Sequence, residues 1–246
     1  MRIGIILGTG WTTSVLSAGI TDFRHDKTMW MTTPYGEPSS SIRLFKGEMH
    51  QLLVLMRHGE RQSTPAHEIP HAANACVMAE LAPDWVLCLG TAGTLSSKIK
   101  VGELGRISEY STHYSPDTTE GYDLGSRQNR NTSNINLTWP PLLPGINIRF
   151  TDQIRYVQIR GPEAATSIDV KYYQDMGFDA IGMTLAREDF QLWHLRLLTV
   201  PICFITDSCG RTTESAQWMK LVENGSKIIN RLITAHMRLN NEFQTV

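Results

Sequence analysis

The sequence predicts an α/β protein, in which buried strands alternate with amphipathic helices. Short apolar runs of strand length recur along the chain, and several of them end at a glycine or a hydroxyl residue. Segments with helical spacing of apolar residues follow some of these runs. Because ligands of open α/β sheets collect at the carboxyl ends of the strands, we expect the functional site where these runs end.

The size and charge of the chain fit one domain that binds a small molecule. No long proline- or serine-rich linker divides the 246 residues, so residues 1–246 are expected to form a single domain. The 23 basic and 24 acidic residues leave a net charge of −1. This balance argues against a nucleic-acid surface held by phosphate contacts.

The cysteine pattern and the apolar runs indicate a cytoplasmic protein. The four cysteines form no CxxC pair, and two of them lie inside apolar runs. The N-terminal apolar run is too short for a signal peptide, and no stretch approaches the ~18 apolar residues of a membrane span. We therefore expect no membrane association.

The first predicted strand is Arg2–Leu7, and a tight turn of sequence GTG follows it at residues 8–10. The glycines let backbone N–H groups approach an anion, and Thr9 adds a hydroxyl. The turn does not match the dinucleotide-binding fingerprint, because Thr13 stands where the third glycine belongs. A turn without a ligand is the alternative.

Two further strands, Ile42–Phe45 and Leu52–Met56, are expected to form a hairpin. The second strand runs directly into Arg57 and His58. A guanidinium at a strand end suits a fixed fork for phosphate, and His58 could add another donor. A solvated arginine after a strand is the alternative.

The sequence HEIPH at residues 67–71 matches the zinc-protease pattern by letter. That pattern needs both histidines on one uninterrupted helix, which Pro70 prevents, so we expect no metal here. Pro70 instead indicates the first turn of a helix that ends at Ala82. The residues expected to face inward are Ala72, Ala75, Cys76 and Ala79.

Trp85–Leu89 is a continuous apolar run that predicts a buried strand. It opens into a second glycine-rich turn, Gly90–Thr94, which contains Thr91, Ala92 and Gly93. Two such turns together with Arg57 at a third strand end favour a converging anion site.

The middle of the chain is the least regular part. A strand is expected at Gly102–Tyr110, followed by an irregular loop over about residues 111–150, which are polar and without period. Tyr156–Ile159 reads as the next strand. Pro162 is expected to begin a helix that runs to Met176.

The stretch from Gly177 to Glu188 is expected to lie at the centre of the site. Its residues 179–183 predict a buried strand that stops at Thr184 and continues as a helix carrying Glu188. Met183 and Thr184 should then stand at the mouth of a pocket. On this stretch alone, a core strand followed by an ordinary loop is an equal alternative.

The last predicted strand is Pro201–Thr206, which ends at Asp207. The carboxylate would face the same sheet edge as the other strand ends, and a helix N-cap is its alternative role. A closing helix is expected over residues 215–237, where apolar residues recur at helical spacing.

The motifs GTG, RHG, TAGTL, RGPEAAT, AIGMT and TDSCG occur in this order from Ile3 to about Gly210. In this order they resemble the trimeric purine nucleoside phosphorylase superfamily, nearest to its 5′-methylthioadenosine phosphorylase branch. The resemblance implies a three-layer α/β/α sandwich around a twisted mixed β-sheet. It also implies a homotrimer or a dimer of trimers.

The resemblance further implies a division of the site into a phosphate end and a nucleoside end. Met183 and Gly93 would contact the ribose or base, and Asp207 would be the catalytic residue at the purine. Phosphate would be the co-substrate, with no metal or organic cofactor. The implied phosphate-binding residues are Thr9, Arg57, His58, Thr91, Ala92 and Thr184.

The residue types fit this chemistry independently. Cleavage of an N-glycosidic bond passes through a ribosyl cation, which a phosphate dianion below C1′ can both stabilise and attack. The departing purine gathers negative charge, which an acid at N7 can neutralise. As an acceptor, a carboxylate would also favour a 6-amino over a 6-oxo purine.

Three alternatives to a 5′-methylthioadenosine phosphorylase stay open. They are a phosphorylase of 6-oxopurine nucleosides such as inosine, a nucleoside-binding protein without turnover, and a hydrolase that uses water. The residues that meet the 5′ substituent are expected in the irregular loop, where His113, Tyr114 and Tyr122 are candidates by position.

Overall fold

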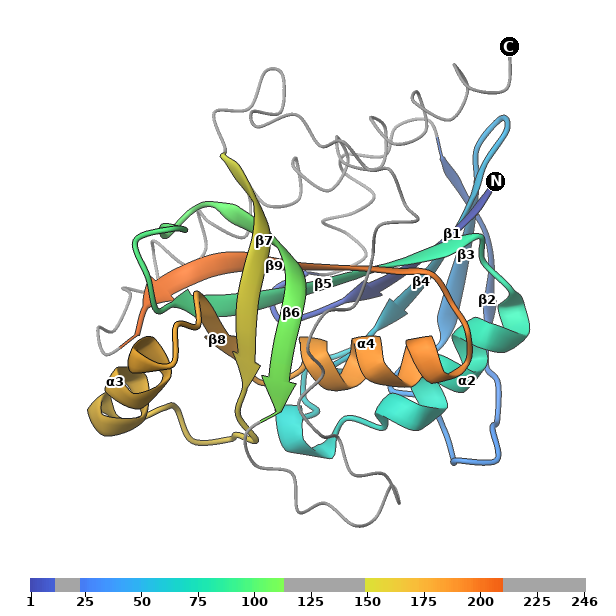
Figure 1. Cartoon of the computed structure of the whole chain (residues 1–246). Helices are drawn as coiled ribbons and strands as arrows, with labels where there is room; N and C mark the ends of the chain where they lie inside the picture. Colours follow the sequence, from blue (N-terminus) through green and yellow to red (C-terminus); the bar gives the residue numbers. More distant parts are fainter. Residues whose placement is uncertain (12–22, 113–148, 210–246) are drawn as a thin grey trace.

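The structure, a computed structural model, describes residues 1–11, 23–112 and 149–209 (Figure 1). Within these ranges the strands belong to a single mixed sheet. The strands are β1 (Arg2–Leu7), β2 (Arg24–Met29), β3 (Ile42–Lys46), β4 (Gln51–Met56), β5 (Trp85–Thr94), β6 (Leu104–Thr112), β7 (Phe150–Gln158), β8 (Ala180–Gly182) and β9 (Thr199–Ser208).

The strand order is β2-β3-β4-β1-β5-β8-β7-β6-β9, and β9 also pairs with β5. The strands from β5 to β9 therefore form a closed ring of pairings, while β4, β3 and β2 extend from β1 as an open sheet. β1 is parallel to both β4 and β5, and β5 is parallel to β9. The α/β class and the mixed sheet that we predicted are confirmed.

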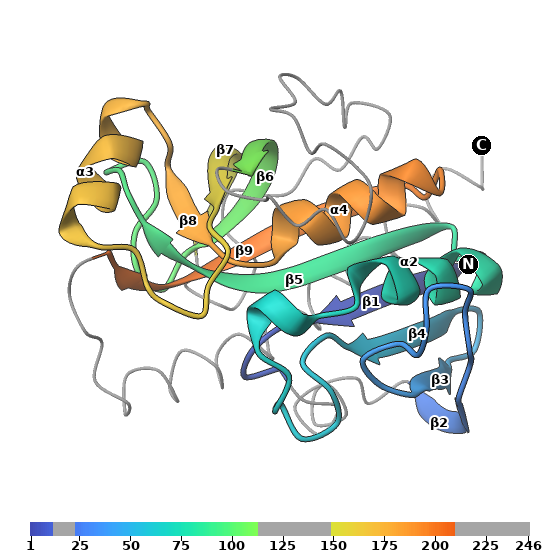
Figure 2. The same ribbon diagram turned by 90° about the horizontal axis from the view of Figure 1, so that it is seen from below.

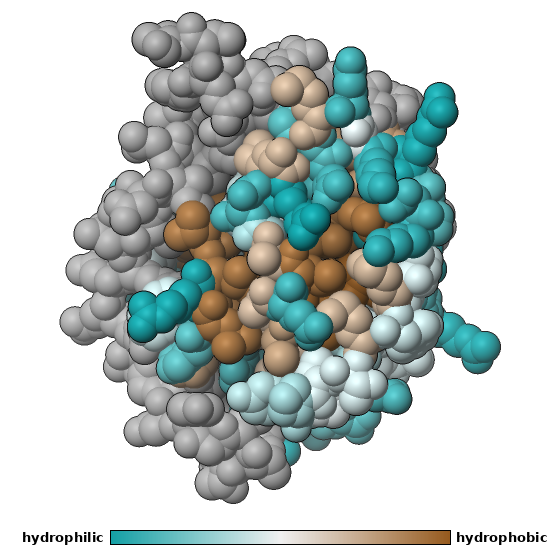
Figure 3. Space-filling model, turned by 90° about the vertical axis from the view of Figure 1, so that its right-hand side faces the viewer, coloured by the Kyte–Doolittle hydropathy of each residue, from teal (hydrophilic) through white to brown (hydrophobic). Residues whose placement is uncertain are grey.

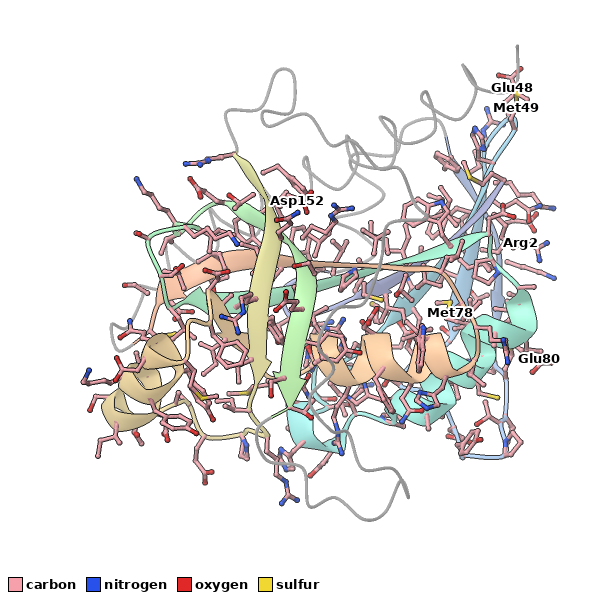
Figure 4. The ribbon with its side chains drawn as sticks, in the orientation of Figure 1. Arg2, Glu48, Met49, Met78, Glu80 and Asp152 are labelled. Carbon is pink, nitrogen blue, oxygen red and sulfur yellow. The ribbon has the colours of Figure 1, made fainter. Side chains whose placement is uncertain are left out.

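Helices α2 (His71–Leu81) and α4 (Leu185–His194) lie beside each other on one face of the sheet (Figures 1 and 2). Met78 of α2 is buried in this layer, and its sulfur lies 3.3 Å from where a Cβ on Gly4 of β1 would stand. Figure 4 labels Met78. The absence of a side chain at Gly4 thus lets α2 approach the sheet closely.

The other face of β1 contributes Ile3, Ile5 and Leu7 to a second apolar cluster with Trp11 and Phe204. Alternation along the strand explains this division, because successive side chains point to opposite faces. The closing helix predicted for residues 215–237 lies outside the described residues.

Several element boundaries differ from the sequence prediction. Helix α3 spans Ser167–Asp175 rather than beginning at Pro162, because Thr166 caps it. The Asp169 N–H donates to the Thr166 hydroxyl at 3.2 Å, and Asp169 accepts from the Thr166 N–H at 2.9 Å. Such a reciprocal capping box sets a helix start more strongly than a preceding proline.

The inward face predicted for α2 was also wrong. Only Ala75 of the predicted set is buried, together with the neighbouring side chains of Asn74, Val77 and Met78. The helix packs against both the sheet and α4, so its buried positions do not form one narrow stripe. In an alanine-rich helix the apolar residues do not mark one face, so the sequence does not show which positions will be buried when two sides are covered.

The predicted irregular loop was too long at both ends. β6 continues through Thr112 and β7 begins at Phe150, with Arg106 of β6 paired to Asp152 of β7 at 2.6 Å. Asp152 is labelled in Figure 4. The remainder of the predicted loop, residues 113–148, lies outside the described residues.

The surface includes both hydrophilic and hydrophobic areas. Seen from the right-hand side of Figure 1, hydrophobic side chains gather in an area bordered by hydrophilic ones (Figure 3). Among the described residues, no helix is long and apolar enough to cross a membrane.

His71, the first residue of α2, is an ionisable side chain in the core. It is 2% exposed, and neither ring nitrogen has a hydrogen-bond partner within the described part of the chain. Burial lowers the pKa of His71 well below its ordinary value of 6.5, and the nearby charges of Arg57 and Arg187 add to this effect. The folded protein therefore holds His71 neutral.

We predict that His71 makes the fold sensitive to acid. The unfolded chain takes up a proton at His71 below its ordinary pKa and the folded chain does not, so stability falls as pH falls through that range. Between about pH 7.5 and about pH 5.5, the wild type should lose about 1 kcal/mol more unfolding free energy than His71→Leu. Urea denaturation at both pH values measures this difference.

The matched control is His25→Leu, at an exposed position of β2. It leaves His71 in place, so the acid sensitivity that is due to His71 should persist in this variant. If the wild type and His71→Leu lost the same unfolding free energy between the two pH values, His71 would not be the cause of the acid sensitivity.

Candidate active site

A cavity of about 240 Å³ opens at the carboxyl end of the central strands. All of the site residues predicted from the sequence line it, namely Thr9, Arg57, His58, Thr91, Ala92, Gly93, Met183, Thr184 and Asp207. The remaining lining residues are mostly small or apolar: Ala66, Ile159, Ala164, Ala165, Ile181, Gly182, Thr206 and Cys209. The structure thus brings five separate segments together at one place.

The parallel strands explain why these segments meet. Leu7 of β1 stands opposite Met56 of β4 on one side and Leu89 of β5 on the other. The Arg57 N–H donates to the Leu7 carbonyl at 2.9 Å, so the chain leaves both strands at the same edge. Thr9 and His58 follow immediately, and they enter the cavity side by side.

The second glycine-rich segment is not a turn, as we had predicted, but the continuation of β5 through Thr94. Its Gly90 serves close packing, since an added Cβ would lie 2.8 Å from Cγ of Leu185 in α4. Gly8 has the same function, because a Cβ there would lie 2.9 Å from Nη1 of Arg57. These glycines let the arginine and the helix reach the strand ends.

Arg57 is fully buried and forms an ion pair with Glu188 of α4. Its Nε donates to Glu188 Oε2 at 2.6 Å, and its Nη2 donates to Glu188 Oε1. Nη2 also donates to the Leu89 carbonyl at 3.2 Å. The bidentate fork that we expected for phosphate is therefore directed at a carboxylate of the protein itself.

The ion pair shifts the pKa of Arg57. Burial opposes the charge of the guanidinium, but the Glu188 carboxylate outweighs burial and raises the pKa of Arg57. The opposite charges of the pair largely cancel for any ligand in the cavity. Arg57 thus remains a cation, although a compensated one.

Arg57 also orients Thr184, the residue before α4. Its Nη1 donates to Thr184 Oγ1 at 2.8 Å, so the hydroxyl oxygen accepts and keeps its own proton for a ligand. Thr184 makes no side-chain hydrogen bond that caps α4. Its hydroxyl is a donor at the cavity wall.

His58 is held between Thr64 and Thr9. Its Nδ1 lies 2.8 Å from the Thr64 carbonyl oxygen, and its Nε2 lies 3.0 Å from Thr9 Oγ1. Burial lowers the pKa of His58, and the positive charge of Arg57 adds to this effect. The imidazole is therefore neutral near pH 7.

Asp207 of β9 lines the same cavity, beside Gly93 of β5. A bulge between Ala92 and Gly93 places Gly93 opposite Asp207. A Cβ on Gly93 would lie 2.8 Å from Asp207 Oδ1 and would also collide with the sulfur of Cys209. The Thr206 hydroxyl donates to Asp207 Oδ2 at 2.9 Å, which leaves Oδ1 as the atom above Gly93.

Sequence reasoning placed Glu188 on the helix after Thr184 but missed its ion pair with Arg57. It did not include Cys209, which lines the cavity, among the site residues. Glu188 lies one helical turn after Thr184, a spacing that puts both side chains on the same side of α4. Cys209 lies two residues after Asp207, the spacing of side chains on one face of an extended segment. Burial raises the pKa of the Cys209 thiol to about 12, and the Asp207 charge adds to this effect.

The structure does not assemble a metal site from the HEIPH sequence. His67 belongs to a short 3₁₀ helix, Ala66–Glu68, whereas His71 begins α2. Across the described ranges, no three His, Cys, Asp or Glu side chains are grouped to hold a metal ion. His113, Tyr114 and Tyr122, the candidates for the 5′ substituent, lie outside those ranges.

We predict that Glu188→Ala destabilises the protein by about 3–5 kcal/mol, because it leaves the Arg57 charge buried without a partner. Removing both charges, in Arg57→Met with Glu188→Leu, should recover much of this loss. Urea denaturation of the single and double variants measures the effect.

The control is Asp175→Ala, which removes an exposed partner of Lys171 in α3. An exposed pair contributes less than about 1 kcal/mol, so this variant should unfold like the wild type. If Glu188→Ala were as mild as the control, the ion pair would not be a main constraint on the fold.

Comparison with known proteins places this chain in a family. The family model for the phosphorylase superfamily matches residues 2–235. The chain is 27% identical to S-methyl-5′-thioadenosine phosphorylase of Pyrococcus furiosus, over 94% of this chain and 90% of that protein. It is 23% identical to 6-oxopurine nucleoside phosphorylase of the same organism, over 90% of each chain.

Solved structures show the same fold. The structure of methylthioadenosine phosphorylase from Schistosoma mansoni in complex with adenine matches with a TM-score of 0.76 and 18% identity. The match covers 98% of this chain and 92% of that one. Since the family model spans nearly the whole sequence and the fold agrees, the chain belongs to the phosphorylase superfamily.

Proposed function

We propose that this protein catalyses the phosphate-dependent cleavage of the N-glycosidic bond of a purine nucleoside, with 5′-methylthioadenosine as substrate. The products are free adenine and a ribose 1-phosphate derivative. One observation supports the proposal: a single cavity is lined both by hydroxyl and imidazole groups near Arg57, which reaches Leu89 of β5, and by the Asp207 carboxyl group, which lies at Gly93 further along β5. This arrangement suits an oxyanion nucleophile and a purine leaving group.

The phosphate end comprises Thr9, His58 and Thr184 around Arg57, with the backbone of Thr91 and Ala92. Hydroxyl donors and the compensated arginine would hold the phosphate below C1′ of the sugar. The bond from C1′ to the purine breaks ahead of the new bond that a phosphate oxygen forms to C1′. The negative charge of the phosphate stabilises the ribosyl cation between these two events.

The purine end contains Asp207, which would share a proton with N7 as the base departs. The same carboxylate can accept a hydrogen from a 6-amino group, which favours adenine. Gly93 leaves the space that the carboxyl group occupies. Met183, which follows β8 and lines the same cavity, would contact the ribose.

A 6-oxopurine nucleoside phosphorylase is the second candidate. It is supported by the relative of that name, which matches over as much of its length as the methylthioadenosine phosphorylase does. Asp207 argues against it, because a carboxylate and a 6-oxo group are both acceptors.

We further propose that the protein is a cytoplasmic homotrimer or a dimer of trimers. Ile168, Tyr172 and Met176 are exposed and recur every fourth position along α3 and its C-cap. Such an apolar row on a helix supports an interface with another copy of the chain.

We predict that base release requires phosphate and is fastest with 5′-methylthioadenosine. The assay compares methylthioadenosine, adenosine and inosine, with and without phosphate, and follows the free base. Release without phosphate would instead indicate a hydrolase, and faster turnover of inosine would favour the second candidate. Binding of nucleoside without turnover would refute the enzymatic proposal.

We predict that Asp207→Ala lowers kcat by ~10²-fold or more while the fold persists, because the departing base loses its acid. Asp207→Asn keeps the shape and adds an amide donor, so it should shift the preference from methylthioadenosine toward inosine. Circular dichroism checks the fold of both variants. Near-normal rates in Asp207→Ala would remove Asp207 from the reaction.

A further inference from the structure

The direction of the hydrogen bond between Thr9 and His58 follows from the atoms on either side of the imidazole. The Thr64 carbonyl oxygen can only accept, so His58 Nδ1 must carry a proton. In the neutral ring, Nε2 then has no proton and accepts. Thr9 Oγ1, 3.0 Å away, therefore donates its hydroxyl proton to Nε2.

This direction is unsuited to an incoming oxyanion. Thr9 has one hydroxyl proton, which it already donates in the hydrogen bond to His58 Nε2. His58 has no proton on the ring nitrogen next to Thr9. A fully deprotonated anion would thus meet lone pairs at the Thr9 oxygen, although both residues line the cavity.

We propose that binding of an oxyanion in this cavity is coupled to the uptake of one proton by His58, which reverses the Thr9–His58 hydrogen bond. Once Nε2 carries the proton, it donates to Thr9 Oγ1, and the Thr9 hydroxyl turns to donate to the anion. No covalent bond to carbon changes, and solvent or buffer supplies the proton. The inference rests on the anion-binding end of the proposed function, not on the nucleoside reaction.

The charges around His58 favour a coupling between anion binding and protonation of its ring. Arg57 follows β4 immediately before His58, and Glu188 of α4 balances its charge. His71 of α2 is close enough for His58 to affect its protonation, and it is itself neutral. A bound dianion would add negative charge beside His58, opposing the remaining effect of Arg57, and would favour the imidazolium.

The coupling must act in both directions. If an anion favours protonation of His58, protonation of His58 favours the anion by the same factor. Because burial and Arg57 keep the pKa of His58 low in the empty cavity, anion affinity should fall as pH rises above that pKa. The proposed site therefore takes its oxyanion together with a proton.

Sulfate is the probe, because it carries two charges and no proton near neutral pH. Titration calorimetry of the full chain at about pH 7.5, in buffers of different ionisation enthalpy, should show uptake of about one proton per sulfate bound. The dissociation constant should rise about tenfold per pH unit above the pKa of His58 in the free protein. NMR of the His58 ring should show its titration moving to higher pH when sulfate is added.

His58→Gln tests the role of titration, since a glutamine amide can donate to Thr9 without taking up a proton. It should bind sulfate with no proton uptake and with a flat pH profile. Thr9→Val should weaken sulfate binding. The matched variant Thr9→Ser keeps the hydroxyl, so it should retain both sulfate binding and proton uptake.

Sulfate binding to the wild type without proton uptake, or a pH profile that His58→Gln leaves unchanged, would overturn the inference. These outcomes are distinguishable from failure of the proposed reaction. Proton-linked sulfate binding in a protein that releases no base would support the inference and refute the phosphorolysis.

Discussion

The buried ion pair between Arg57 and Glu188 joins the end of β4 to the first turn of α4. An isolated charge in this position would be costly, so each partner requires the other to be in place. Arg57 passes Gly8, which has no side chain to obstruct it, and Leu185 of α4 packs against Gly90 of β5. It therefore fixes the distance between strand ends and helix, and with it the shape of the cavity.

The same ion pair reduces the electrostatic attraction that Arg57 would exert on an anion in the cavity. A guanidinium that already holds a carboxylate offers little net charge, and its remaining contribution passes through the Thr184 hydroxyl. The other donors at this end are hydroxyl, imidazole and backbone groups. An anion held by such groups depends on which way their protons point, and the Thr64 carbonyl sets that direction at His58.

Sequence reasoning succeeded where a strand ends at a polar residue. Parallel strands share one edge, so Thr9 and Arg57 could be brought together from apolar runs alone, and Asp207 followed from the next buried strand. It failed for long-range contacts. Nothing local distinguishes a glycine in a turn from Gly90, which lies in a strand and accommodates Leu185, and no spacing reveals that Arg57 would meet Glu188. Both depend on packing between distant segments.

The proposed purine end of the cavity depends on a carboxyl group and a thiol rather than on hydroxyl donors. The raised pKa of Cys209 keeps its thiol neutral beside the Asp207 carboxyl group. A neutral thiol is a weak donor and does not compete as an acid, so in the proposed reaction Asp207 is the side chain that would exchange a proton with the base. Because Gly93 leaves room for both side chains, one backbone position determines whether the Asp207 carboxyl group can occupy its place in the cavity.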